Sequence, residues 1–458
     1  MSKTSKNIEM TTGNLWINIL KFALPLALTG ILQQLFNAAD TAIVGNFTGD
    51  MGSMAQAAVG ANTSLVSITV NLFIGFALGA NVVIANSIGR KDNKSASKAV
   101  HTSIVFAILA GIVMAIIAQF VAGSVFRLMD VPEDVIPLAT VYFRIYMGGL
   151  PVIILYNFEA AIFRGTGNTR TPLAALAVSG VLNVLLNLFF VCVLRMTVEG
   201  VAIATVASNA VSSVILFIRL MKQDGVVKVE PQKLGIDVQI LKKIMRIGIP
   251  AGLQSTVFGV ANIIIQSAIN SLGTTVMAAS AAAFNIELFA YSVLNSFSQA
   301  CTTFVGQNFG AGKIDRCKKS LLLCFAEGII AMALSIVIIL AFGRDILYLF
   351  NKDPEIIETG YIRLMVIFSA YTFTLSYELM SGYLRGFGIS LVPSILTMIG
   401  ICGTRITWIA TVFQTHKSLG YIMAAYPVSL STTAFLILIA LLIIKPSKKY
   451  QIKPESGK

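Results

Sequence analysis

Long apolar runs alternate with short polar connectors along the whole chain of 458 residues. A helix of about 20 apolar residues is long enough to cross the hydrocarbon of a bilayer. The alternating ten-residue pattern of membrane β-strands is not seen. We therefore predict an all-α membrane protein with twelve membrane-spanning helices, at residues 16–44, 55–87, 96–121, 136–162, 172–194, 200–220, 240–270, 275–307, 320–341, 357–383, 392–414 and 419–444.

The pattern repeats itself at an interval of 221 residues. The segments RGTGNTRTP (164–172) and RGFGISLVP (385–393) each end one apolar run and begin another. Arginine at a helix end, followed by two glycines and a proline, predicts a C-cap and a turn. At nearly the same interval, Pro25 corresponds to Pro250. Six spans fall in each copy, which predicts two halves of the same topology, as in transporters built from parallel repeats.

Composition and charge agree with a membrane protein. The chain is 56% hydrophobic and only 12% charged, whereas soluble domains carry about 25% charged residues. Most of its 34 Lys and Arg lie in the connectors on the side of both termini, and the opposite connectors hold only Arg127, Arg195, Arg344, Lys352 and Lys417. The positive-inside rule therefore places both termini in the cytoplasm of a multi-pass protein of the cell membrane. The net charge of +13 follows from this topology, so we expect the lipid bilayer and no nucleic acid as a partner.

One long polar connector, from Lys222 to about Val238, lies between the two halves on the cytoplasmic side. It divides the chain into three parts. We predict an N-terminal six-helix lobe (1–221), a cytoplasmic linker (222–238) and a C-terminal six-helix lobe (239–458).

Polar side chains within spans are functional candidates because they are costly in hydrocarbon. In the first half they form three sets at helical spacing: Gln33, Asn37 and Asp40; Ser179, Asn183 and Asn187; and Thr205 with Asn209. If these helix faces converge, Asp40 lies among amide and hydroxyl oxygens, which suit a proton or Na⁺. Asp40 is the strongest candidate, because no cationic side chain lies close to it in its span.

The second half carries polar residues on different faces. Its sets are Asn262, Gln266 and Asn270; Glu287, Tyr291, Asn295 and Ser298; and Tyr371, Thr374 and Glu378. A carboxylate beside tyrosines in an apolar cavity suits a lipophilic cation, through charge pairing and cation–π contact. We therefore predict a substrate cavity lined by Gln33, Asn37, Asn262, Gln266, Glu287, Tyr291, Tyr371 and Glu378.

Structural explanations for the same side chains stay open. Buried ion pairs are one of them: Glu159 with Arg144 or Arg363, and Glu378 with Arg405. Glu327, near the start of its predicted span, is expected at the membrane interface. Rows of amides also join helices without binding a ligand.

Motifs of nucleotide and enzyme chemistry are missing from the sequence. It has no GxxxxGK[ST] phosphate loop, so we do not expect ATP-driven transport by this chain. Its two histidines, His101 and His416, lie in no HExxH pattern, and its five cysteines show no paired spacing. We therefore expect neither an enzyme nor a resident metal or other cofactor.

The chain resembles the multidrug and toxic compound extrusion (MATE) family over essentially its full length. The resemblance rests on the twelve spans in two halves, the prolines of the first and seventh spans, and the RGTGNTRTP segment. It rests also on AADTAIVG around Asp40, VLNVLLN (181–187), GVAIAT ending at Thr205, and GQNFGAGK (306–313).

The resemblance implies two pseudo-symmetric six-helix bundles arranged as a V. It further implies a cation- or proton-coupling site at Asp40, Asn183, Asn187 and Thr205. Many relatives carry a second carboxylate at the position of Asn187. One negative charge fewer weakens Na⁺ binding but leaves Asp40 able to carry a proton, so H⁺ and Na⁺ both stay open as the coupling ion.

The resemblance also implies secondary active efflux of amphipathic, mainly cationic drugs or toxins in antiport with H⁺ or Na⁺. A monomer is the expected state. The alternative is a flippase or exporter of lipid-linked cell-envelope precursors, which the wider superfamily also contains. Binding a pyrophosphate requires a cavity rich in Arg or Lys, and the spans offer only Arg144, Arg363 and Arg405.

Overall fold

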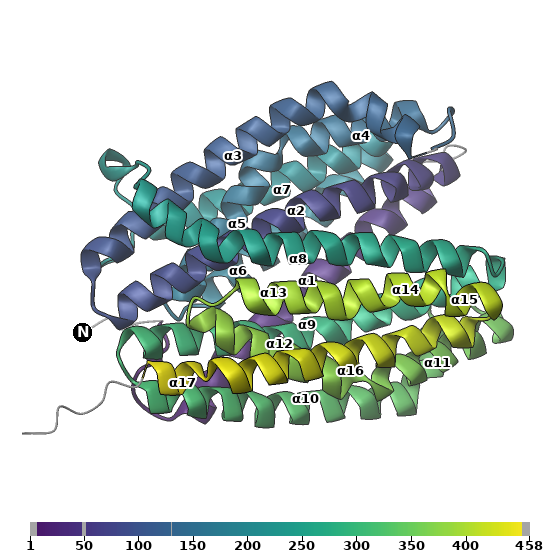
Figure 1. The fold of residues 1–458 in the computed structure, drawn as a ribbon. Helices are drawn as coiled ribbons and strands as arrows, with labels where there is room; N and C mark the ends of the chain where they lie inside the picture. Colours follow the sequence, from purple (N-terminus) through teal and green to yellow (C-terminus); the bar gives the residue numbers. More distant parts are fainter. Residues whose placement is uncertain (1–6, 48–51, 130, 451–458) are drawn as a thin grey trace, which may run out of the picture. The chain divides into compact units, whose positions relative to one another are not determined.

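A computed structural model describes residues 7–47, 52–129 and 131–450, and over these ranges the regular structure is helical (Figure 1). The first half holds α1 (Leu15–Phe47), α2 (Gly52–Gly89), α3 (Asn93–Leu128), α4 (Ile136–Gly148), α5 (Leu150–Gly165), α6 (Arg170–Leu188), the π-helix η2 (Phe189–Val193), α7 (Val198–Met221) and the 3₁₀ turn η3 (Pro231–Lys233). The second half holds α8 (Val238–Asn270), α9 (Thr274–Gly310), α10 (Ile314–Tyr348), α11 (Pro354–Ser369), α12 (Tyr371–Gly386), α13 (Leu391–Thr397), the π-helix η4 (Met398–Gly403), α14 (Thr404–Ala410), α15 (Val412–Thr415), α16 (Leu419–Ile444) and α17 (Pro446–Lys449).

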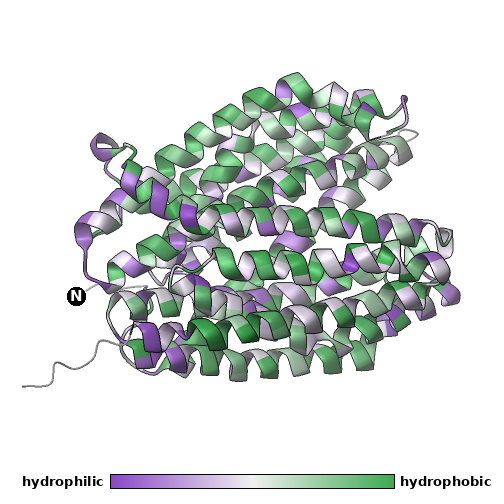
Figure 2. Ribbon diagram, in the orientation of Figure 1, coloured by the Kyte–Doolittle hydropathy of each residue, from purple (hydrophilic) through white to green (hydrophobic). Residues whose placement is uncertain are grey.

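The helices match the predicted spans. Within the described ranges, 10 helices are long and apolar enough to cross a membrane, or up to 12 if each of two bent helix pairs is one span. The bent pairs, α4 with α5 and α11 with α12, correspond to the predicted spans 136–162 and 357–383. The all-α membrane fold is therefore confirmed. Figure 2 shows apolar residues along the helices and hydrophilic residues at their ends and in the connectors.

The internal repeat reappears in the bounds of the helices. α1 and α8 are both 33 residues long, and α5 and α12 are both 16. A bend precedes each 16-residue helix, by 47° at Gly149 and by 46° at Ala370. In the first copy, Pro151 explains the bend because it has no N–H to donate and its ring clashes with the preceding turn. The second copy bends at the same place without a proline.

The paired RGxG segments are helix caps. α5 and α12 end in them, and the second glycine of each, Gly167 and Gly388, has a φ of +88° and +81°. Glycine adopts this conformation without the penalty that a Cβ causes. Beyond Gly167, the Asn168 N–H donates to the Phe163 carbonyl at 2.9 Å, as in a Schellman cap. The predicted C-cap and turn are confirmed in both copies.

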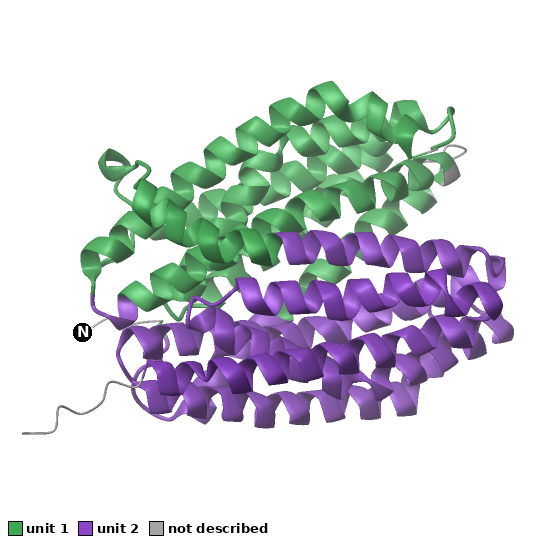
Figure 3. Cartoon of the chain, viewed as in Figure 1, with its two compact units in different colours: residues 1–7, 28–87, 92–252 green, residues 8–27, 88–91, 253–458 purple. Residues whose placement is uncertain are grey.

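The chain forms two compact units, coloured separately in Figure 3. Unit 1 contains residues 28–87 and 92–252, and unit 2 contains residues 8–27, 88–91 and 253–458. α1 and α8 each contribute to both units, and each changes unit shortly after its internal proline, Pro25 or Pro250. The predicted lobes (1–221 and 239–458) stay a prediction, and the units differ from them in the first part of α1 and of α8.

Within unit 1, α2 and α8 cross at two pairs of glycines. Gly75 and Gly79 of α2 lie against Gly248 and Gly252 of α8, with backbone facing backbone. A Cβ added at Gly252 would lie 2.6 Å from the Leu72 carbonyl oxygen. Helices in lipid associate through such close contacts because the bilayer supplies no hydrophobic drive.

The Gly252→Val substitution is expected to destabilise unit 1 by about 1–3 kcal/mol, because its nearest neighbour is the Leu72 backbone carbonyl, which cannot move aside as a side chain can. Thermal unfolding in detergent measures the effect. Gly60→Val on α2 is the matched control, since nothing lies within 4 Å of a Cβ added there. Equal melting temperatures for the two variants would contradict the role of the glycine crossing.

In unit 2, the turn between α9 and α10 holds the chain segment that precedes α1. The Arg316 guanidinium donates to the carbonyls of Met10, Thr12 and Gly13 at 3.0 to 3.3 Å. The Asn308 amide also donates to Met10, at 3.1 Å, and Asn308 accepts from Arg316. Asn308 and Lys313 of the GQNFGAGK segment (306–313), together with Arg316 just beyond it, therefore hold the residues before α1 by their backbone carbonyls.

Candidate functional site

Asp40 lies on α1, and both of its carboxyl oxygens contact other spans of unit 1. The Asn187 amide of α6 donates to Oδ1 at 2.5 Å, and the Thr205 hydroxyl of α7 lies 3.2 Å from Oδ2. The Asn187 amide also donates to Asn183 Oδ1 at 3.2 Å. The structure therefore joins the four residues Asp40, Asn183, Asn187 and Thr205 in one network, here called the coupling site. Their role in coupling stays a prediction.

Close approach of α1 to α6 makes this network possible. A Cβ at Gly180 would overlap the ring of Phe36, which lies one turn before Asp40 on α1. Asn183 and Asn187 follow Gly180 on the same face of α6, and both are buried. The close contact between Gly180 and Phe36 thus brings the Asp40 carboxylate next to the buried amides of α6.

The coupling site has fewer hydrogen-bond donors than acceptors. The single hydroxyl proton of Thr205 has two acceptors, Oδ2 of Asp40 and the Val201 carbonyl at 2.9 Å. Asn187 Oδ1 is buried and has no partner among the described residues. The site therefore offers one acceptor oxygen, in addition to its single carboxylate, that could bind a further donor or a cation.

The other polar residues of the first half are not part of this network. Gln33 and Asn37 of α1 are exposed. The Ser179 hydroxyl accepts from Ser212 at 2.5 Å, and the Asn209 amide donates to the Thr205 carbonyl at 2.8 Å. Among the three residues predicted on one face of α1, only Asp40 forms hydrogen bonds with α6 and α7 among the described residues.

Glu287 of α9 forms a buried ion pair with Arg363 of α11. The guanidinium donates to both carboxylate oxygens, at 2.8 and 3.2 Å. The two side chains are only 9% and 2% exposed, respectively. Tyr371, also in the predicted cavity set, donates its hydroxyl to the Glu287 carbonyl at 3.1 Å. Arg363 neutralises Glu287, so this carboxylate is not free to attract a cationic ligand.

Among the described residues, the hydrogen-bond partners of the Glu378 side chain on α12 are neutral. The Tyr291 hydroxyl donates to Oε1 at 3.0 Å, and the Ser298 hydroxyl lies 3.2 Å from Oε2 and 2.9 Å from the Glu378 carbonyl. Glu378 is 6% exposed. Because no ion pair occupies this carboxyl group among the described residues, it can serve as a contact for a cationic ligand.

The remaining predicted cavity residues of unit 2 lie in separate contacts. Asn262 of α8 accepts from Arg405 at 3.4 Å, and Gln266 donates to Asn270 at 2.8 Å. Arg405 is buried, donates to Ser429 at 3.1 Å and lies over the ring of Tyr426 at 4.2 Å.

The buried ion pairs that the sequence left open as alternatives are not formed among the described residues. Glu159 accepts from Ser213 at 2.9 Å, and Arg363 pairs with Glu287. The ion pairs of Glu159 with Arg144 or Arg363, and of Glu378 with Arg405, are not formed among the described residues. Glu327 is 3% exposed and lies in α10, where it faces the interior of unit 2, and its expected place at the membrane interface stays a prediction. The pairings depend on which helix faces meet, and spacing within one helix does not reveal that.

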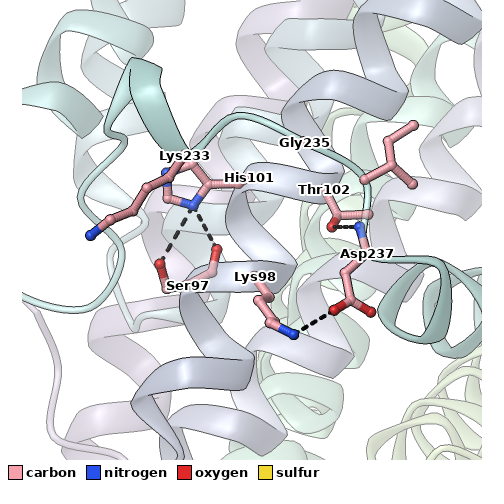
Figure 4. Close-up of a pocket in the computed structure, with 8 residues that line it drawn as sticks. Ser97, Lys98, His101, Thr102, Lys233, Gly235 and Asp237 are labelled. Carbon is pink, nitrogen blue, oxygen red and sulfur yellow. Dashed lines mark hydrogen bonds and ion pairs between the residues drawn. The ribbon is translucent and has the colours of Figure 1, made fainter.

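A pocket of about 400 Å³ lies where the linker meets α3 (Figure 4). His101 donates from Nδ1 to the Ser97 carbonyl at 2.7 Å and accepts at Nε2 from the Glu230 N–H at 3.1 Å. Lys98 donates to Asp237 at 2.7 Å, and this bond lowers the pKa of the Asp237 carboxyl. These contacts fasten the linker to α3, and the pocket contains none of the predicted coupling or cavity residues.

Known proteins of similar sequence include proteins named as probable multidrug resistance proteins. The chain is 25% identical over 433 residues to the probable multidrug resistance protein YoeA of Bacillus subtilis, with 93% of each chain covered. It is 26% identical over 420 residues to the probable multidrug resistance protein NorM of Thermotoga maritima, with 89% of this chain and 87% of the relative covered.

Solved structures support the fold. An outward-facing multidrug resistance MATE family transporter of the MOP superfamily aligns with a TM-score of 0.89 at 23% identity, over 98% of this chain and 100% of that one. At this identity the likeness concerns the fold alone. The family model MatE matches residues 25–189 and again residues 250–411, once in each copy of the repeat. This chain is therefore a multi-pass membrane protein of the MatE family.

Proposed function

We propose that this protein is a secondary active transporter that exports amphipathic, mainly cationic small molecules in exchange for H⁺ or Na⁺. The observation that carries the proposal is the coupling site, where one carboxylate is shared by α1, α6 and α7. Relatives named as multidrug resistance proteins support the substrate class. We further propose that the protein is not an enzyme, acts as a monomer and keeps both termini in the cytoplasm.

A proton fits the coupling site best. If Oδ2 of Asp40 carries a proton, it donates to Thr205, and Thr205 in turn donates to the Val201 carbonyl at 2.9 Å. Each hydroxyl then has one acceptor, and the Asn187 amide still serves Oδ1. Na⁺ would instead use oxygen atoms of Asp40, Asn183 and Asn187, but with one carboxylate it gains less charge compensation.

Coupling requires that the ion and the substrate favour different conformations. Neutralising Asp40 removes the charge that holds the amide and the hydroxyl in place. Because these groups belong to α6 and α7, ion binding changes how three spans of unit 1 pack. The ion therefore binds with different affinity to conformations in which α1, α6 and α7 pack differently.

Glu378 is the proposed contact for a cationic substrate. Its partners Tyr291 and Ser298 are neutral, whereas Glu287 is neutralised by Arg363. The flippase alternative needs several free cationic side chains for a pyrophosphate. Of the arginines in unit 2 spans, Arg363 is already paired with a carboxylate, so this alternative is not favoured.

Transport by reconstituted protein tests the proposal. Proteoliposomes are loaded with a fluorescent lipophilic cation, and a pH gradient or a Na⁺ gradient is imposed separately. We expect the pH gradient to drive exchange when Na⁺ is absent on both sides. Exchange driven by Na⁺ alone, at equal pH, would assign Na⁺ as the coupling ion. Exchange under neither gradient would contradict coupled transport.

A further inference from the structure

Glu327 is a buried carboxyl group in unit 2 that has no role in the proposed antiport. It lies in the stripe of α10 that faces the interior of unit 2, together with Cys324 and Gly328. Its side chain is 3% exposed. Neither carboxyl oxygen has a hydrogen-bond partner among the described residues.

The surroundings of Glu327 hold no compensating charge. α10 packs against α9, α11, α12 and α17. Leu375 of α12 lies against Gly328, the next residue. The titratable neighbour is the thiol of Cys324, which also contacts Cys301 of α9. No ion pair or hydrogen bond reaches the Glu327 carboxyl from the described residues.

The other charged groups on these helices have partners of their own or lie at helix ends. The paired groups are Glu287 with Arg363, Arg344 with Glu358, Asp315 with Lys318, Glu378 with Tyr291, Arg385 with Gln254, and Arg316 with the carbonyls before α1. Lys319 lies exposed near the start of α10, and Asp345 and Glu355 lie exposed in the last turn of α10 and the first turn of α11. Lys448 and Lys449 lie on the terminal α17.

The repeat shows that the helical scaffold does not need a carboxyl group here. The position equivalent to Glu327 in the first copy is Phe106 of α3. Its ring lies 6.2 Å from that of Phe76 and 5.8 Å from that of Phe158. The equivalent position in unit 1 is therefore occupied by a half-buried apolar side chain that packs against two other rings.

We propose that Glu327 is a second proton-binding site of the transporter, separate from Asp40. An unpaired carboxylate in the membrane interior is far less stable than the neutral acid, so Glu327 holds a proton while α9, α10 and α12 are packed as described. When water enters between α9, α10 and α12, the proton of Glu327 passes to water. The hydrated carboxylate that remains is the stable form at neutral pH. The inference rests on the proposed antiport and adds a proton to each cycle.

Infrared spectroscopy and proton counting test the inference on the full-length protein. In the Asp40→Asn background, the infrared band of a protonated carboxylic acid is expected to persist, and to lose intensity when Glu327→Gln is added. In proteoliposomes, Glu327→Gln alone is expected to lower the number of protons exchanged per substrate by about one. Glu355→Gln, an exposed residue of α11, is the matched control and should change neither quantity.

The outcomes separate this inference from the proposed antiport. If the wild type shows no proton-driven exchange, the proposed coupling itself fails. If the wild type exchanges protons but Glu327→Gln leaves both the infrared band and the proton count unchanged, Glu327 is not a proton site. A lost band with an unchanged proton count would also overturn the inference, because the proton would then be permanent. Glu327→Asp, which keeps the acid, is expected to retain the band and to show that loss in the Gln variant is not misfolding.

Discussion

Replacing Asp40 by asparagine is expected to lower ion-driven transport by about 100-fold, at the upper end of typical coupling free energies. The substitution keeps the size of the side chain but removes the only ionisable group of the coupling site. Neither a proton nor Na⁺ then changes the charge between α1, α6 and α7. Fluorescent substrate exchange in proteoliposomes under an imposed pH gradient measures the loss.

The matched control is Asp134→Asn, the same change at an exposed position before α4. It should transport like the wild type. The melting temperature of the Asp40→Asn protein should stay close to that of the wild type, because an amide can still bond to Asn187 or Thr205. Undiminished gradient-driven exchange by folded Asp40→Asn protein would remove Asp40 from the coupling mechanism.

Breaking the Glu287–Arg363 pair with Arg363→Met is expected to cost about 3–5 kcal/mol of folding free energy. The loss leaves Glu287 as an uncompensated charge in the interior of unit 2. Unfolding in a detergent series measures it. The double variant Glu287→Gln with Arg363→Met should recover most of the stability, because it removes both charges.

A second ion pair of the same chemistry provides the control. Arg344 and Glu358 are joined by two bonds of 2.9 Å, but their side chains are 55% and 54% exposed. Arg344→Met should therefore change stability little. If Arg363→Met is no more destabilising than Arg344→Met, the buried pair does not stabilise unit 2. Transport by the stable double variant would show that Glu287 supports the fold and does not bind substrate.

Features that depend on neighbours in the chain could be predicted well. The twelve spans follow from runs of apolar residues, because a run of sufficient length crosses a bilayer whatever surrounds it. The caps at Gly167 and Gly388 also follow from the local sequence, since a glycine just after a helix supplies the positive φ of a C-cap.

The coupling site was predicted in part. Helical spacing places Asn183 and Asn187 on one face of α6, but it does not say which helix that face meets. The family resemblance supplied the link to Asp40 and Thr205, and the structure places all four in contact. The close approach at Gly180 was not anticipated, because a glycine in an apolar run shows its purpose only when the opposite helix is known.

Charge pairing in unit 2 could not be predicted. Glu287 and Arg363 are distant in sequence, and three arginines and several carboxylates within spans allow many combinations. That Glu327 has no partner could not be predicted either, because the residues around it come from helices that are distant in the sequence.

The sequence by itself determined that this is an all-α membrane protein with a duplicated set of spans, since hydrophobic length, the repeat and the caps are properties of consecutive residues. The tertiary structure alone decided which buried charges are neutralised, as at Glu287, and which are left without a partner, as at Glu327. The free energy of a charge in the membrane depends on the atoms within a few ångströms, and these come from helices far apart in the chain.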